Sequence, residues 1–363
     1  GDCMNIAYAL AGEGRGHTTR AIGLADRLIE AGHKIQFFTC GDAVDLLEKR
    51  YGAESVTYLE TPRFVLGKRG ISYFGTAYAT AKFIKGHRNR VKDCINQLQH
   101  YQPDALISDF EPTFARAAKK LDKPIISFNS QRFSLDTKLA DRLSISQRAR
   151  LFPVRLLCKI FTPRPALSVI SKGFNLEPKK ADVHLVGPML RPQFFPGAWQ
   201  PQGTHAVAYM RKSVLCHFDA IVDHARKHGL KVKLYGHKPE EIPEDVISCP
   251  ISNQGFIDDL LSCDLIYQTA GSQLLGEVGV LGLPSLCIPE PGQVEQEINA
   301  VLASKAYANV AMLNKRKITV DDLDAALLSA NNESPTIIFD NGVEAAYNAI
   351  QNFLDSRITN IAS

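Results

Sequence analysis

The chain lacks the features of a secreted, zinc-binding or membrane-spanning protein. Its eight cysteines stand singly, with no Cys-x-x-Cys pair, which argues against a zinc site or a disulfide framework and fits a reducing compartment. It has no apolar run of the ~18 residues that a spanning helix needs, and no secretion signal is recognisable. We therefore expect a cytoplasmic protein.

Two common nucleotide-binding motifs are also missing. In the stretch AGEGRGHTTR, residues 11–20, the glycines stand at alternate positions, whereas a dinucleotide fingerprint needs Gly-x-Gly-x-x-Gly and an acidic residue after the next strand. That strand is expected to end at Thr39 and Cys40, and no Walker loop matches. An NAD-dependent dehydrogenase is therefore the weakest candidate.

The sequence does contain enough apolar material for two globular domains. Of its 363 residues, 45% are hydrophobic and 22% are charged, which is typical of soluble folded domains. Short buried strands alternate with amphipathic helices in both halves, which predicts α/β domains with doubly wound, Rossmann-like sheets. We expect strands at 5–10, 34–38, 104–108, 124–128, 205–210, 231–236, 264–268 and 284–289, and helices at 18–31, 112–121, 213–228 and 273–280.

Proline spacing indicates where the two domains separate. The stretch VGPMLRPQFFPGAWQP carries four prolines, too many for a helix or an inner strand. We predict a first domain over residues 1–190, a linker over 191–203 and a second domain over 204–341. Apolar residues at helical spacing predict a last helix within 342–363 that packs back towards the first domain.

Charge is distributed unevenly between the halves. Residues 1–190 hold 29 Lys and Arg against 18 Asp and Glu, and the rest of the chain holds 13 against 20, which suggests that the first half meets an anionic partner. The basic segments 82–92 and 142–172 interleave apolar residues, a composition suited to an anionic lipid surface. Ordinary solvated helix faces are the alternative, and Pro153, Pro163 and Pro165 are expected to break any long amphipathic helix. Nucleic acid is not expected, because no binding module accompanies the charge.

The alternating glycines lie directly before His17. Glycines let a ligand approach the backbone closely, and the helix that follows offers its positive N-terminus to a polar or anionic group. Histidine exchanges a proton near neutral pH, which suits it to deprotonate a hydroxyl group. A packing or capping role for His17 is the alternative.

A second motif lies in DLIYQTAGSQLLGEVGVLGLPSLCIPEPGQVEQEINA, residues 264–300. This segment resembles the donor-binding segment of glycosyltransferases with the GT-B fold. It is similar to family 28, whose members add N-acetylglucosamine to lipid-linked peptidoglycan precursors, and to the family 1 UDP-glycosyltransferases. With AGEGRGHTTR and ISDFEP (107–112), the chain looks most like a poorly characterised branch of archaea and bacteria. The resemblance implies two Rossmann-like domains that face each other across a cleft.

The resemblance also implies roles for single residues. His17 is the implied catalytic base and Asp109 the acid that orients it, with Glu111 as a competitor of Asp109. Glu277 is implied to accept the ribose hydroxyls, and the helix that Ser272 can cap is implied to receive the diphosphate. The implied acceptor-binding residues are Gly14, Arg15, Gly16 and Glu111, and the implied donor-binding residues are Arg211, Phe256, Thr269, Gly271, Ser272, Gln273, Glu277, Glu295 and Gln296.

The implied reaction moves a sugar, with inversion, from a nucleoside-diphosphate sugar to a hydroxyl group. A UDP-sugar is the first choice of donor, and the acceptor is a saccharide, a small molecule or, as our leading hypothesis, a lipid-linked molecule at the inner face of a membrane. No metal cofactor is expected, because the only Asp-x-Asp, at 322–324, falls in a predicted helix where positions two apart point to different sides. A sugar-nucleotide epimerase of the same fold and a non-catalytic sugar-nucleotide-binding subunit remain the alternatives.

Overall fold

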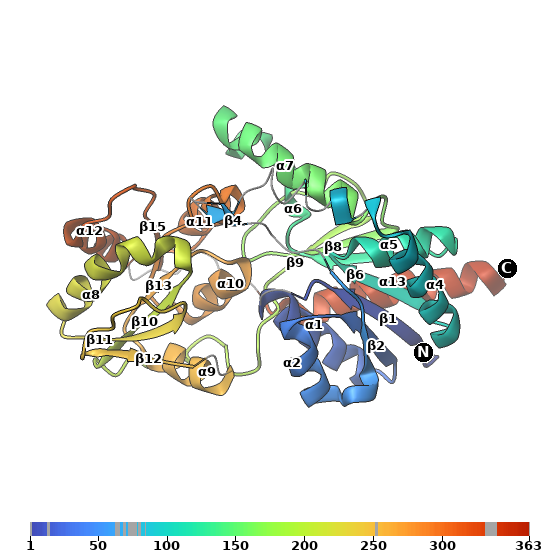
Figure 1. The fold of residues 1–363 in the computed structure, drawn as a ribbon, viewed down its shortest axis with the longest axis horizontal. Helices are drawn as coiled ribbons and strands as arrows, with labels where there is room; N and C mark the ends of the chain where they lie inside the picture. The colour runs from blue at the N-terminus through green and yellow to red at the C-terminus, as the bar shows by residue number, and fades with distance from the viewer. Residues whose placement is uncertain are drawn as a thin grey trace.

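The computed structural model contains two α/β units that lie side by side (Figure 1). It describes residues 2–12, 15–61, 66–67, 70–71, 78, 81–83, 85–250, 253–330 and 340–362. The first unit is built on a sheet of seven parallel strands in the order β3-β2-β1-β6-β7-β8-β9. These strands are β1 (Asn5–Leu10), β2 (Lys34–Thr39), β3 (Val56–Tyr58), β6 (Ala105–Asp109), β7 (Ile126–Asn129), β8 (Leu167–Ser171) and β9 (Val183–Val186).

The second unit has a sheet of six parallel strands in the order β12-β11-β10-β13-β14-β15. These are β10 (His205–Met210), β11 (Lys231–Gly236), β12 (Val246–Ser248), β13 (Ile266–Gln268), β14 (Ser285–Cys287) and β15 (Val310–Met312). A separate antiparallel pair joins β4 (Leu66–Gly67) to β5 (Gly70–Ile71). The prediction of an α/β protein with two doubly wound sheets is confirmed.

Helices cover both faces of each sheet (Figure 1). In the first unit they are α1 (Arg15–Glu30), α2 (Asp42–Tyr51), α4 (Arg88–Tyr101), α5 (Pro112–Lys120), α6 (Phe133–Asp136) and α7 (Ile145–Phe161), with 3-10 turns η1 (Ala53–Ser55) and η2 (Ala140–Arg142). In the second unit they are η3 (Lys212–His217), α8 (Phe218–Lys227), α9 (Asn253–Ser262), α10 (Ser272–Leu281), α11 (Val294–Ala306) and α12 (Val320–Ala330), and α13 (Gly342–Ala362) follows. Within the described ranges, none of these helices has the length and hydropathy required to cross a bilayer.

The strand order reverses beside the first strand of each sheet. β1 lies between β2 and β6, and β10 lies between β11 and β13. In open parallel sheets, ligands bind outside the carboxyl ends of the strands at such a reversal. Asp109 ends β6 in register with Leu10, the last residue of β1, and the segment starting at Thr269 follows the end of β13. The topology therefore singles out one edge of each sheet as a binding edge.

Two apolar arrangements hold the units together. One buried cluster includes Phe110 and Phe174 from the first unit and Leu275 and Val278 from the second, so the units share a core. The last helix, α13, buries Ile350 and its apolar neighbours within the core of the first unit. Figure 1 shows α13, in red, alongside the first unit although it follows the second unit in the chain.

Two predicted helices and one predicted helix break differ from the structure. α1 begins at Arg15 rather than at Thr18, because glycine tolerates helical dihedrals at a helix start, where few backbone hydrogen bonds depend on it. The helix expected at 213–228 is divided into η3 and α8. α7 continues through Pro153, since the carbonyl that loses its helical donor belongs to Ala149, which is exposed to water.

The glycines of the first loop have different neighbours. A Cβ added to Gly12 would lie 2.1 Å from the carbonyl oxygen of Cys40, which is backbone and cannot move aside. A Cβ added to Gly16 would meet its nearest atom, the Cβ of Gln273, at 4.0 Å. Gly12 is thus required by packing between the ends of β1 and β2, whereas Gly16 is not.

We predict that Gly12→Ala lowers the free energy of unfolding by about 1–3 kcal/mol, the usual effect of overpacking. Gly16→Ala is the matched control and should leave the melting temperature nearly unchanged, since its Cβ makes only an ordinary contact. Thermal or urea unfolding of both variants tests this. Equal destabilisation by the two changes would contradict it.

Candidate functional site

The first candidate group is a histidine paired with a buried carboxylate. His17 lies in the first turn of α1, and its Nδ1 is 2.9 Å from Oδ1 of Asp109. Asp109, at the end of β6, has no exposed surface, and Arg20 donates to its other oxygen at 2.9 Å. The structure thus brings His17 and Asp109 together and adds Arg20 one turn along the same helix.

The electrostatics keep this carboxylate ionised. Burial by itself would raise the pKa of Asp109, but the hydrogen bonds and electrostatic interactions that it makes with His17 and Arg20 outweigh burial and hold that pKa below its usual range. An ionised carboxylate can only accept, so the Nδ1 of His17 carries a proton. The side-chain nitrogen of Gln131, which can only donate, lies 3.3 Å from Nε2, so Nε2 accepts through its lone pair. This is the tautomer that a general base requires.

The residue after Asp109 has an unusual backbone conformation. Phe110 has a φ of 60°, a left-handed conformation that costs a non-glycine residue about 1–3 kcal/mol. Its ring stacks with the imidazole of His17 at a centroid distance of 6.5 Å. Such conformations cluster at functional sites, and this one places a ring against the paired histidine.

Glu111 does not compete with Asp109 for His17. It is the N-cap of α5, and its Oε2 accepts the backbone N–H of Phe114 at 2.6 Å. Burial raises the pKa of Glu111 to about 7. In the structure Glu111 therefore caps a helix, and the acceptor-binding role implied for it stays a prediction.

The second candidate group surrounds the start of α10. Ser272 was expected to cap this helix, but this expectation is wrong: Ser272 is the first helical residue and Gly271 is the N-cap, without a side-chain hydrogen bond. The preceding Ala270 has a φ of 67°, so the chain turns sharply from β13 into the helix. The first N–H groups of α10 are therefore left without a capping side chain, which is the usual state of an anion-binding helix start.

The two groups adjoin each other. Gly16 in the first turn of α1 lies against Gln273 in the first turn of α10, and Figure 1 shows these helices meeting where the units touch. The Nε2 of Gln273 donates to the carbonyl of Met189 at 2.7 Å. The histidine and the helix start that suits an anion thus belong to one site.

Glu277 lies further along α10 and is fully buried. Nη2 of Arg191 donates to both of its oxygens, at 3.0 and 2.7 Å, and Gln273 donates to Oε1 at 3.0 Å. A solvated helix glutamate, the alternative to a ribose contact, is therefore excluded, and the ribose role itself stays a prediction.

The remaining implied donor residues are more dispersed. Gln296 bonds reciprocally with Glu290, which also accepts from Ser213 beyond β10. Arg211, two residues before Ser213, is exposed. Phe256 is buried in α9, and its ring packs against the rings of Tyr209 and Tyr235. The position of Phe256 is that of a core side chain. Gly14 and the side chain of Arg15 lie outside the described residues.

Lys172 joins the two groups across the units. It follows β8, is only 2% exposed, and its Nζ donates to Oδ1 of Asn299 in α11 at 2.9 Å. Asn299 in turn donates to the carbonyl of Ala270, before α10, at 3.5 Å. Burial lowers the pKa of Lys172 to about 8, partly opposed by the nearby Glu295. Lys172 is thus a buried cation that titrates near neutral pH at the contact between the units.

Sequence reasoning missed Arg20, Gln131, Lys172 and Arg191. Gln131 and Lys172 come just after β7 and β8, as Asp109 ends β6. Because the carboxyl ends of parallel strands meet at one edge of a sheet, polar residues at successive strand ends were the signal that would have found them. Arg20 is three residues after His17 and so shares its helix face.

Comparison with known proteins gives this geometry its context. The family model for glycosyl transferase family 1 matches residues 4–328. An uncharacterized glycosyltransferase of Methanosarcina acetivorans is 25% identical over 331 residues, which cover 83% of this chain and 84% of that protein.

Solved structures show the same fold. CalG4, the calicheamicin glycosyltransferase, superposes with a TM-score of 0.65 at 14% identity, over 97% of this chain and 98% of its own. MurG of Acinetobacter baumannii superposes with a TM-score of 0.57 at 15% identity, over 96% and 99% of the two chains. The fold is therefore that of the GT-B glycosyltransferases, and with the family match it confirms the implied class of enzyme: the chain belongs to glycosyl transferase family 1 and is a glycosyltransferase.

Proposed function

We propose that the protein is an inverting, metal-independent glycosyltransferase that moves a sugar from a UDP-sugar to a hydroxyl acceptor. The observation that carries this proposal is the meeting of two helix starts. One presents His17, paired with buried Asp109, and the other, at Gly271 and Ser272, has uncapped N–H groups. A base and an anion site in contact are what a direct displacement at a sugar phosphate requires.

In the proposed reaction the acceptor hydroxyl gives its proton to Nε2 of His17. The oxygen forms a bond to the anomeric carbon, while the bond from that carbon to the diphosphate oxygen breaks and its electron pair leaves with the nucleoside diphosphate. Asp109 stabilises the imidazolium that forms. A single displacement of this kind inverts the anomeric configuration.

The negative charge that develops on the leaving diphosphate is proposed to be stabilised by the first turn of α10. Backbone N–H groups and the helix dipole act there without reorganisation. Lys172 supports the loop before this turn through Asn299 and Ala270. We therefore regard Lys172 as a positioning residue and expect no metal to be needed.

The acceptor is proposed to lie at an anionic membrane surface. Three apolar side chains on α7, Ile145, Phe152 and Leu156, are 78%, 62% and 41% exposed, and their spacing places them on one helix face. Arg148 and Lys159 are exposed on the same helix. Figure 1 shows α7 at the upper margin of the molecule. Exposed apolar residues flanked by basic ones are typical of helices that lie on anionic lipid.

Two measurements on a panel of UDP-, dTDP- and GDP-sugars test the donor. A UDP-sugar at 100 times its Kd should stabilise the protein by about 2.7 kcal/mol, seen as a rise in melting temperature, and should release UDP when acceptor is present. The proposal would be refuted if no sugar nucleotide of the panel raised the melting temperature and none released its nucleoside diphosphate. Epimerised sugar without UDP release would favour the epimerase.

The His17→Ala variant should lower the rate of UDP release about 100- to 10,000-fold, the range of general base catalysis. The rise in melting temperature with UDP should persist, because the nucleotide is assigned to α10. His100→Ala, at an exposed site at the end of α4, is the control and should leave both values unchanged. An unchanged rate in His17→Ala would remove His17 from the mechanism.

Activity should fall as pH rises above about 8, because Lys172, whose pKa burial lowers to about 8, then loses the charge that holds Asn299. Lys172→Met should reduce kcat/KM for the donor roughly tenfold at pH 7 and abolish this alkaline decrease. A pH profile of kcat/KM for both proteins tests the assignment. If kcat/KM of the variant still fell at alkaline pH, a group other than Lys172 would be responsible for the decrease.

Binding to liposomes tests the membrane surface. The protein should co-sediment with phosphatidylserine vesicles at low salt and dissociate at high salt, since screening weakens the attraction of the basic residues. Phe152→Ser should weaken binding, whereas Phe195→Ser, an exposed phenylalanine of the linker region, should not. Absence of binding at low salt, or equal binding of both variants, would leave α7 as an ordinary solvated helix.

A further inference from the structure

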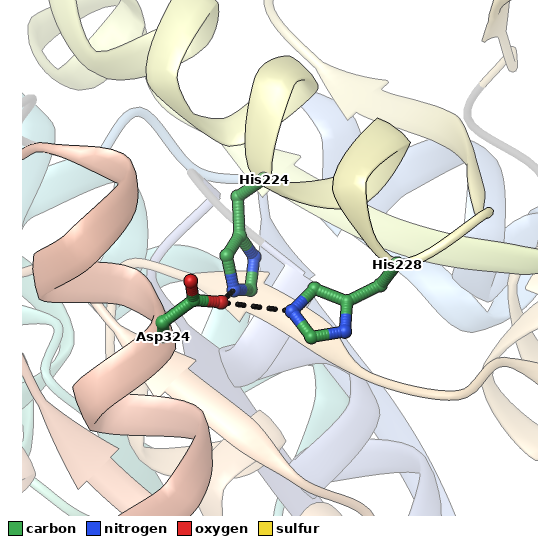
Figure 2. Close-up of side chains that lie close together, drawn as sticks. All are labelled: His224, His228 and Asp324. Carbon is green, nitrogen blue, oxygen red and sulfur yellow. Dashed lines mark hydrogen bonds and ion pairs between the residues drawn. The ribbon is translucent and has the colours of Figure 1, made fainter.

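A separate group of polar side chains lies in the second unit, on α8 and α12. His224 and His228, four residues apart on α8, and Asp324 on α12 point towards one another (Figure 2). Oδ1 of Asp324 is 3.0 Å from Nε2 of His224 and 2.8 Å from Nε2 of His228. One ligand atom from each of the three residues falls within 4.8 Å of the other two.

This spacing is close to that of a metal centre. Histidines four apart share a helix face, and ligand atoms about 2.0–2.2 Å from one tetrahedral zinc ion stand ~3.3 Å from each other. The two nitrogen–oxygen distances, 3.0 and 2.8 Å, are only a few tenths of an ångström shorter. Small side-chain rotations would open the space for an ion.

The environment of His224 gives an independent reason. Its side chain has no exposed surface, and its Nε2, although 3.0 Å from Oδ1 of Asp324, makes no well-formed hydrogen bond. A buried polar atom that lacks a well-formed hydrogen bond destabilises the folded state. An ion bound in the plane of the ring would remove this destabilisation.

The other nitrogen of His224 is held as in known metal centres. Its Nδ1 is 2.6 Å from the hydroxyl of Tyr267 on β13. When Nδ1–H donates a hydrogen bond to this hydroxyl oxygen, the lone pair of Nε2 is left for a metal, and such an outer contact fixes both the tautomer and the ring orientation. Tyr267 would thus be the orienting residue.

The two oxygens of Asp324 face different neighbours. Lys227 pairs with Oδ2 of Asp324, so Oδ1 is the oxygen turned to the histidines.

We propose that His224, His228 and Asp324 bind a divalent transition-metal ion, Zn²⁺ by preference, with water as the fourth ligand. A donor set of two imidazoles and a carboxylate suits Zn²⁺ better than Mg²⁺ or Ca²⁺. The ion would tie α12 to α8. Figure 1 places these helices at the end of the second unit away from α1, so this site is distinct from that of sugar transfer and has a structural role.

Calorimetric titration of the chelator-treated, full-length protein with Zn²⁺ tests the proposal. One ion per chain should bind and raise the melting temperature, and millimolar Mg²⁺ should not displace it. His228→Gln and Asp324→Asn should each weaken binding more than tenfold, and Tyr267→Phe roughly tenfold, as is usual for outer contacts. Co²⁺ in place of Zn²⁺ should show the intense visible absorption of tetrahedral coordination.

Asp321→Asn and His100→Gln are the matched controls, because both residues are exposed and lie outside the group. They should bind Zn²⁺ as the unchanged protein does. Circular dichroism confirms that each variant is folded, and His228→Gln, at a partly exposed position, keeps the test independent of the buried His224. Failure of the unchanged protein to bind Zn²⁺, or unchanged affinity in both His228→Gln and Asp324→Asn, would overturn the proposal.

Discussion

The arrangement of the candidate site depends on one buried charge, the carboxylate of Asp109. An unpaired ion with no exposed surface would be too costly to retain. Arg20 supplies the compensating charge, so the imidazole of His17 does not need to be protonated to balance Asp109. Asp109 can then hold His17 in the tautomer of a base and still stabilise the cation that forms after proton transfer. Arg20 therefore stabilises the buried carboxylate, and His17 can stay neutral, as a catalytic base must.

The sheet topology explains why these residues meet. β6, β7 and β8 run parallel and end at one edge, and Asp109, Gln131 and Lys172 belong to, or just follow, these ends. The second sheet brings its own edge, with Gly271 and Ser272, against the first. A site formed in this way needs contact between two helix starts, and Gly16 on α1 lies against Gln273 on α10 there.

Much of this was predictable from the sequence, for physical reasons that also explain the failures. Apolar patterning predicted both sheets, because buried parallel strands are near-continuous apolar runs. The glycine motif and the family resemblance singled out His17, Asp109 and the start of α10 as candidates, and the structure places Asp109 against His17 and the two helix starts in contact. The pairing of Arg191 with Glu277 and of Lys172 with Asn299 joins residues 86 and 127 positions apart, and no local pattern encodes such contacts. The expectation that Pro153 breaks the helix was wrong. The free-energy cost of that proline depends on whether the carbonyl of Ala149 reaches water, which is decided by tertiary structure.

The contacts of Glu277 suggest how donor binding and domain arrangement are linked. A carboxylate offers about four acceptor positions, and Arg191 and Gln273 already occupy three of them. Two ribose hydroxyls cannot both bind there unless one of these donors gives way. Arg191 opens the predicted linker, and Gln273 also holds Met189 just before it. Loss of the Arg191–Glu277 contact or of the Gln273–Met189 contact would loosen the segment that connects the units. A ribose bound at Glu277 would therefore alter how α10 packs against α1.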